Sequence, residues 1–132
     1  ITIDNLPTLY ASARLMRPLF QNLISNALKY KKQDVNPVIS IRSDTMTENQ
    51  TTKLPGNRYV RIYVEDNGIG FEQKYAEDIF GMFRRLHNNG EFEGTGIGLA
   101  LCKKIVEQHQ GFISARSLVN QGSTFIISFP VK

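Results

Sequence analysis

The segment from Arg14 to Tyr30 has the pattern of an amphipathic helix with two amides in it, and it constrains the fold more than any other part of the chain. Asn22 and Asn26 lie one helical turn apart in an otherwise apolar run. At about 100° per residue, these amides share roughly one third of the helix circumference with Lys29 and Tyr30. Buried amides are costly unless something bonds them. We therefore expect the apolar side to pack in a core. The polar side suits a metal-bound, phosphorylated, aromatic ligand.

The size and composition of the chain are those of one globular domain covering residues 1–132. Its 132 residues are 41% hydrophobic and 21% charged, which is enough for a hydrophobic core. No apolar stretch approaches the roughly 20 residues that span a bilayer, and no signal-peptide pattern is visible. The single Cys102 excludes an internal disulfide and is compatible with a reducing compartment, and we expect a cytoplasmic domain. Because Cys102 lies in a helical run, we expect it to be a small core residue. Because the first residue is Ile1, we expect a piece of a longer protein.

The pattern of the remaining segments predicts an α+β fold. Residues 38–43 and 59–65 alternate between apolar and polar side chains, as strands with one covered face do. A second helix is expected at 98–110, with Gly111 as its C-cap. Two further strands are expected at 112–117 and 123–129, a short helix with loop at 72–83, and a mobile hairpin loop at 44–57. Hairpins that alternate with helices favour a two-layer sandwich with the helices on one face.

Two glycine-rich stretches complete the candidate ligand site. The first, residues 66–70, begins with Asp66 at the end of a predicted strand, and its glycines permit φ > 0 and close approach of a flat ligand. The Asp66 carboxylate can accept a hydrogen bond from an exocyclic amine such as adenine N6. Alone, however, Asp-Asn-Gly is also an ordinary turn. The second stretch, residues 94–98, precedes an apolar helix, where free N–H groups and the helix dipole suit phosphate.

Two common nucleotide-binding motifs are excluded by the spacing of these glycines. The dinucleotide-binding turn is Gly-x-Gly-x-x-Gly directly after a strand, whereas residues 94–98 read Gly-x-Gly-x-Gly and follow no predicted strand. A P-loop requires Gly-Lys-Ser or Gly-Lys-Thr, which is absent here. The site therefore belongs to neither class.

Taken together and in this order, the motifs resemble the ATP-binding catalytic domain of sensor histidine kinases, within the superfamily shared with gyrase, MutL and the heat-shock chaperones. The matching segments are residues 21–30 (N box), 66–71 (G1 box), 79–83 (F box), 94–100 (G2 box) and 122–125. The resemblance implies a Bergerat-type fold, with a mixed β-sheet, helices on one face and a mobile ATP lid between Phe71 and Gly94. Residues 85–87 are more specifically similar to kinases attached to bacterial phytochromes and PAS sensors.

The resemblance also implies a role for each residue of the site. Asn26 is expected to bind Mg²⁺ through its amide oxygen, a hard ligand of the kind that magnesium prefers. Asn22, Lys29 and Arg85 are expected beside the phosphates as the catalytic residues, and Asp66 is expected to recognise adenine. The other implied ATP-binding residues are Tyr30, Gly68, Gly70, Gly94, Thr95, Gly96, Ile97, Gly98 and Leu99, together with Ser123 and Thr124, which would bond adenine through water.

These roles predict transfer of the ATP γ-phosphate to a histidine in two-component signal transduction. The resemblance places that histidine on a separate dimerisation domain, with a response regulator downstream, because neither His87 nor His109 has the setting of an acceptor. Because such kinases dimerise through helices that this chain lacks, the isolated domain is expected to be a monomer.

Several other functions are weighed against this one. Hydrolysis of the gyrase type needs a glutamate where Asn22 stands, and an amide cannot serve as a general base. A relative that phosphorylates protein serine is weakly disfavoured by residues 85–87. A pseudokinase that binds nucleotide and partners without transfer remains open. Nucleic-acid binding has little support, since the net charge of +4 comes with short basic pairs rather than a long basic run.

Overall fold

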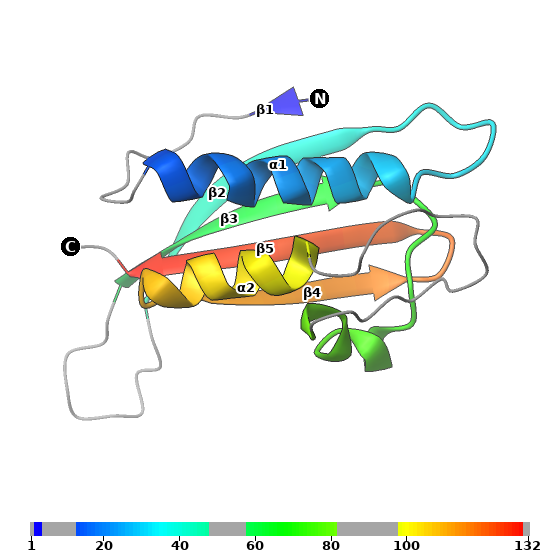
Figure 1. Ribbon diagram of the computed structural model, residues 1–132. Coiled ribbons are helices and arrows are strands. Elements are labelled where there is room, and N and C mark those ends of the chain that lie inside the picture. Colours follow the sequence, from blue (N-terminus) through cyan, green and yellow to red (C-terminus); the bar gives the residue numbers. More distant parts are fainter. Residues whose placement is uncertain (1, 4–12, 48–57, 82–97, 131–132) are drawn as a thin grey trace.

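The computed structural model describes residues 2–3, 13–47, 58–81 and 98–130, which form two layers (Figure 1). The elements are β1 (Thr2–Ile3), α1 (Ala13–Lys29), β2 (Ile39–Thr47), β3 (Arg58–Asp66), the 3-10 turns η1 (Gln73–Tyr75) and η2 (Asp78–Phe80), α2 (Gly98–Gln108), β4 (Phe112–Leu118) and β5 (Gly122–Pro130). The sheet order is β1-β2-β3-β5-β4. β1 pairs with β2 in parallel and the other pairs are antiparallel, so the sheet is mixed, as expected.

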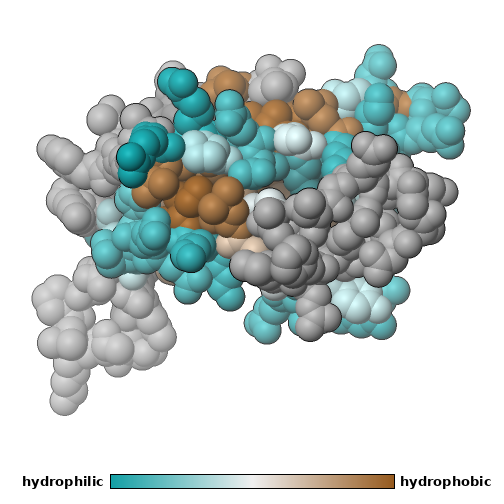
Figure 2. All heavy atoms as spheres, viewed as in Figure 1, coloured by the Kyte–Doolittle hydropathy of each residue, from teal (hydrophilic) through white to brown (hydrophobic). Residues whose placement is uncertain are grey.

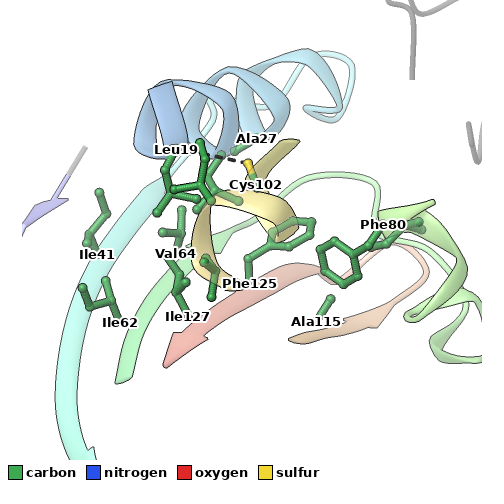
Figure 3. Packing of buried hydrophobic residues seen from close by; sticks show 14 of the residues in the cluster. Leu19, Ala27, Ile41, Ile62, Val64, Phe80, Cys102, Ala115, Phe125 and Ile127 are labelled. Atoms are coloured by element: carbon green, nitrogen blue, oxygen red, sulfur yellow. Dashed lines mark hydrogen bonds between the residues drawn. The ribbon is translucent and has the colours of Figure 1, made fainter. Parts of the chain in front are cut away.

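The hydrophobic core lies between the sheet and the two helices, which cover the same face (Figures 1 and 3). Val64 of β3 and Ile127 of β5 supply two of its fully buried side chains, because every second residue of a strand points to this face. Leu19 and Leu23 of α1 pack onto them, and burying side chains of this size stabilises a fold by roughly 1.5–3 kcal/mol each. The predicted covered face of the 59–65 strand is thereby confirmed.

Cys102 lies in this core at the junction of the two helices. Its thiol is fully buried and lies 3.7 Å from the Leu19 carbonyl oxygen across the α1–α2 contact (Figure 3). Burial raises the pKa of the Cys102 thiol to about 12. The residue is therefore an unreactive core side chain, as the sequence predicted.

β2 continues into the segment that was predicted to be a loop. The strand runs to Thr47, and Asp44 of β2 pairs with Arg61 of the neighbouring strand β3. Arg61 binds the Asp44 carboxylate through two nitrogens, at 2.7 and 2.8 Å, and the Tyr63 hydroxyl donates to it at 2.9 Å. The prediction of a loop from residue 44 was wrong because these cross-strand bonds extend the strand. Residues 48–57 lie outside the described part of the chain.

The first part of the predicted lid packs into the core. Ile79 and Phe80 of η2 are buried, and the Phe80 ring meets the Phe125 ring edge-on at 6.2 Å. A mobile lid was expected from Phe71, but residues 71–81 supply Phe71, Ile79 and Phe80 to the hydrophobic core. Residues 82–94 lie outside the described part.

Helix α2 ends in a left-handed turn one residue before the predicted cap. Gln110 has φ of 58°, its N–H bonds the Glu107 carbonyl, and the Gly111 N–H bonds the Val106 carbonyl, as in a Schellman motif. Gly111 is required for another reason, because a Cβ there would lie 2.1 Å from the Ser128 carbonyl oxygen.

The helical face carries hydrophobic side chains along the seam between α1 and α2 and along the outer edge of α1 (Figure 2). At that outer edge, a shallow groove is lined by Met16, Phe20, Ile24 and Leu28. Neither α1 nor α2, the two α-helices of the described residues, is long and apolar enough to cross a membrane.

Replacing Gln110 with glycine is expected to stabilise the domain by about 1 kcal/mol, because glycine adopts φ > 0 without the cost that a Cβ imposes. Urea unfolding would measure the change. Gly111→Ala is the matched control and is expected to destabilise the domain, since its Cβ meets the Ser128 carbonyl. Loss of stability in Gln110→Gly would show that the left-handed cap contributes no strain.

Candidate functional site

The polar side of α1 faces the first residue of α2. The Asn22 side-chain Nδ2 donates to the Pro18 carbonyl oxygen at 2.8 Å, which fixes the amide. Its Oδ1 then lies at the start of α2, where a Cβ added to Gly98 would be 3.2 Å away. Asn22 and the N-terminus of α2 are thus brought together, although they are far apart in the sequence.

The C-terminal end of α1 meets the turn that follows β3. The Ile69 N–H donates to the Tyr30 carbonyl oxygen at 3.0 Å. A Cβ at Gly68 would lie 2.5 Å from the same oxygen, so only glycine fits. The Lys29 ammonium lies 5.3 Å from the centre of the Tyr30 ring. Tyr30 is therefore next to the predicted adenine-binding turn.

Asp66 stands at the end of β3, partly buried beneath this turn. Its Oδ1 accepts the Gly68 N–H at 2.8 Å, which closes an Asx-type turn. Burial raises the pKa of the Asp66 carboxyl above 3.8, and the nearby Glu65 charge acts in the same direction. The backbone N–H groups of Gly68 and Ser123 partly oppose the rise. A carboxylate has about four acceptor positions, so the Gly68 bond leaves others for a ligand donor.

The other side of the turn is locked to the β4–β5 hairpin through two more glycines. Gly70 has φ of 65°, and a Cβ there would lie 2.1 Å from the Leu118 carbonyl oxygen. Gly122 has φ of 111°, and a Cβ there would lie 2.1 Å from the Asp66 carbonyl oxygen. The turn is therefore held between α1 and the hairpin with no room for side chains at these points.

Two residues that hold the turn were not predicted. Asn67 connects it to the segment after α1, since its Oδ1 accepts the Val38 N–H at 2.8 Å and its Nδ2 donates to the Asn36 carbonyl at 3.1 Å. Ser117 of β4 accepts the Phe71 N–H at 2.8 Å. An Asn in a turn is a signal that the sequence shows. The groups that Asn67 and Ser117 bond, however, are about thirty or more residues away from them in the sequence, so no local pattern indicates these bonds.

Thr124 does not join the predicted site residues. In the β3–β5 register, Ser123 pairs with Asp66 and Thr124 pairs with Glu65. Because successive side chains of a strand point to opposite faces, Thr124 lies on the sheet face away from the helices. Ser123, the other residue expected there, pairs with Asp66 and has its Oγ 2.9 Å from the Ser117 Oγ.

The remaining predicted residues divide into two groups. Leu99 is partly buried and packs against the hydrophobic core. The others lie outside the described residues, so their arrangement stays a prediction: Arg85, Gly94, Thr95, Gly96 and Ile97.

A metal ion at this site would have few protein ligands. Among the described residues, no group of three or more His, Cys, Asp or Glu side chains could hold a metal. Asn26, half-buried on the polar side of α1, remains the candidate ligand. This fits Mg²⁺, which is commonly held by one or two protein oxygens, substrate phosphates and water.

Comparison with known proteins identifies the family of the chain. Residues 11–132 match the family described as histidine kinase-, DNA gyrase B-, and HSP90-like ATPase. Cyanobacterial phytochrome A of Nostoc sp. is 40% identical over 99% of this chain, and the adaptive-response sensory kinase SasA of Rippkaea orientalis is 35% identical over 97%. The chain spans only 16% of that phytochrome and 30% of that SasA.

Solved structures of the same fold include the nucleotide-free catalytic domain of histidine kinase ThkA. It is 29% identical, with a TM-score of 0.70 over 98% of this chain and 75% of that one. Full-length ShkA in complex with AMPPNP is 22% identical, with a TM-score of 0.73 over 98% of this chain and 24% of ShkA. At that identity, the likeness to ShkA concerns the fold alone.

Asp66→Asn is expected to make the domain more stable at neutral pH, because burial penalises the charged carboxylate. Well below the ordinary aspartate pKa of 3.8, the carboxyl group is protonated in both folded and unfolded states, so the two proteins should differ least there. The advantage of the variant should grow as the pH rises through the raised pKa of Asp66 and then stay constant. Urea unfolding across the pH range measures it.

The matched control is Glu107→Gln, which removes an exposed carboxylate from α2 and is expected to change stability little. An Asp66→Asn protein that loses stability as the pH rises would mean that the charge is favourable in the folded state.

Proposed function

The chain belongs to the histidine kinase-, DNA gyrase B- and HSP90-like ATPase family as the ATP-binding catalytic domain of a sensor histidine kinase, and we propose from this premise that it binds Mg-ATP and donates the γ-phosphate to a histidine on a separate dimerisation domain. The sequence-based resemblance is confirmed, including its relation to phytochrome kinases.

One observation carries the proposal: the polar side of α1 lies between the Asp66 turn and the start of α2. Tyr30 contacts the turn at one end of the helix, and Asn22 lies beside Gly98 farther toward the other end. A ligand bound along this side of α1 would have the Asp66 carboxylate at one end and the N-terminus of α2 at the other. That order suits ATP, with a base that donates a hydrogen bond at one end and phosphate at the other.

Adenine would bind at the Asp66 end. The Asp66 carboxylate is a hydrogen-bond acceptor for the N6 amine, and Gly68 and Gly70 let the turn that carries it pack directly against the backbone of Tyr30 and Leu118. The Tyr30 ring would pack against the base. A partly buried carboxylate discriminates well between bases, because a base without a donor at this position would leave the carboxylate without a hydrogen-bond partner, which costs binding free energy.

The phosphates would lie toward Asn22 and Gly98. Phosphoryl transfer depends chiefly on positioning and charge neutralisation. A bound Mg²⁺ would neutralise phosphate charge, held by the Asn26 amide oxygen, and Lys29 would add a second positive charge. Asn22 orients the phosphates without activating water, since an amide cannot take up a proton near neutral pH. This favours transfer over rapid hydrolysis.

The partners follow from the rest of such a kinase. We propose that the acceptor histidine resides in a dimerisation domain of the same protein and that a response-regulator receiver domain accepts the phosphoryl group next. This chain covers only 16% of the phytochrome and 30% of SasA, which supports the proposal that the other parts of the reaction lie in other domains. A structural neighbour in complex with an ATP analogue supports nucleotide binding by this fold. Because ATP and the receiver domain are cytoplasmic in the proposed function, we also propose a cytoplasmic location for this domain.

ATP is expected to bind this domain more tightly with Mg²⁺ than without it. Asp66→Ala should weaken binding by about 10- to 100-fold, the value of a hydrogen bond to a charged group. Asn26→Ala should remove most of the Mg²⁺ enhancement. Calorimetric titration measures both effects, with Ser114→Ala on the other face of the sheet as the control. Equal ATP affinity in Asp66→Ala would refute the assigned adenine site.

Phosphoryl transfer is expected when a dimerisation domain with an acceptor histidine is supplied with ATP and Mg²⁺. The product should be an acid-labile, base-stable phosphate on that domain. Lys29→Ala should slow transfer by at least about 10-fold, since it removes a charge from the transition state. Lys103→Ala, exposed on α2, is the control. Tight ATP binding without transfer would favour the pseudokinase alternative.

A further inference from the structure

The Ser117 hydroxyl joins both flanks of the Asp66 turn. It is buried and lies 2.8 Å from the Phe71 backbone nitrogen, 2.8 Å from the Gly122 carbonyl oxygen and 2.9 Å from the Ser123 Oγ. A serine hydroxyl has one proton and two acceptor positions. Ser117 therefore donates to Gly122 and accepts from Phe71 and Ser123, which uses its full capacity.

These partners are the residues that determine where Asp66 lies. Phe71 follows the last glycine of the turn, so its N–H fixes the exit of the turn. Gly122 packs directly against the Asp66 carbonyl, so its position fixes the entrance. One side chain outside the turn thus links the entrance, the exit and Ser123, the register partner of Asp66.

Gln73 holds the backbone of Ser117 from the other side. Its Nε2 donates to the Ala115 carbonyl at 3.0 Å, and its Oε1 accepts the Ser117 N–H at 2.8 Å. β4 is an edge strand, and the Gln73 amide bonds two of its backbone groups as a neighbouring strand would. The 3-10 turn η1 is therefore fastened to β4 next to the Ser117 hydroxyl.

We propose that Ser117 is a positioning residue for Asp66, supported by Gln73, and that it sets how strongly the site prefers purines with an exocyclic amine. The inference rests on the proposed function, in which Asp66 accepts a hydrogen bond from adenine N6. Hydrogen bonds weaken steeply with distance and angle, so a small shift of the turn costs selectivity before it costs the fold.

The expected loss is specific to the base. In Ser117→Ala, the Phe71 N–H, the Gly122 carbonyl and the Ser123 hydroxyl lose a common partner, and the turn can relax toward other partners. In the proposed function, the phosphates lie against α1 and α2 and not against Ser117. Affinity for a nucleotide without the amine should therefore change little, while affinity for ATP falls.

The experiment compares Kd values for ATP and for purine riboside triphosphate, which lacks the 6-amine, by calorimetry with Mg²⁺. The unaltered chain should prefer ATP, and Asp66→Asn should lose that preference. Ser117→Ala should reduce the preference by about 10-fold, the size expected for one displaced hydrogen bond to a carboxylate. The matched control Ser114→Ala, an exposed serine of the same strand, should keep it.

The ratio of the two Kd values separates positioning from a structural role. A variant that is only partly folded loses affinity for both nucleotides equally, so an unchanged ratio in Ser117→Ala would overturn the inference and leave the proposed function intact. No preference in the unaltered chain would overturn adenine recognition by Asp66 itself. If thermal unfolding shows that Ser117→Ala does not fold, exposed Gln73 supplies the test. Gln73→Ala should reduce the ratio about threefold, and an unchanged ratio there would equally overturn the inference.

Discussion

The close approach of backbone to backbone around the Asp66 turn is the constraint on which the rest of the site depends. Gly68 lies against the Tyr30 carbonyl, Gly70 against the Leu118 carbonyl, and Gly122 against the carbonyl of Asp66 itself. At each point a Cβ would lie 2.1–2.5 Å from an oxygen, far inside contact distance. The turn is thereby held between α1 and the β4–β5 hairpin. Shifting either would move the carboxylate and the end of α1 together.

This arrangement places a carboxylate where burial opposes its charge. The Asp66 pKa is raised mainly by desolvation, whereas Asp44 on the opposite face has its pKa lowered, above all by its hydrogen bond from Arg61. The Asp44 carboxylate thus has a cationic partner within the protein. Asp66 instead has backbone donors and unused acceptor capacity, so a ligand donor would complete its hydrogen bonding. Such a group costs stability and is retained where it has a function.

Much of the fold was predictable because hydrophobic periodicity determines which side of each element is buried. The apolar side of α1 and the alternation in β3 specified the covered face of the sheet, and the structure confirms both. The errors occur where a distant partner overrides a local signal. β2 continues past Asp44 because Arg61 and Tyr63 bond its carboxylate, and α2 caps at Gln110 because Gly111 is needed against Ser128. Neither interaction is visible within a short window of sequence.

The sequence by itself determined the chemical groups of the site: two amides one turn apart, a carboxylate before a glycine turn, and glycines before a helix. These follow from residue type and spacing, which set the helix face and the turn conformation. Only the tertiary structure decided which groups meet. It placed Ser123 rather than Thr124 on the face of Asp66, and it recruited Asn67, Ser117 and Gln73 to hold the turn. The physical reason is that strand register and hydrogen bonds between segments dozens of residues apart depend on how the layers pack.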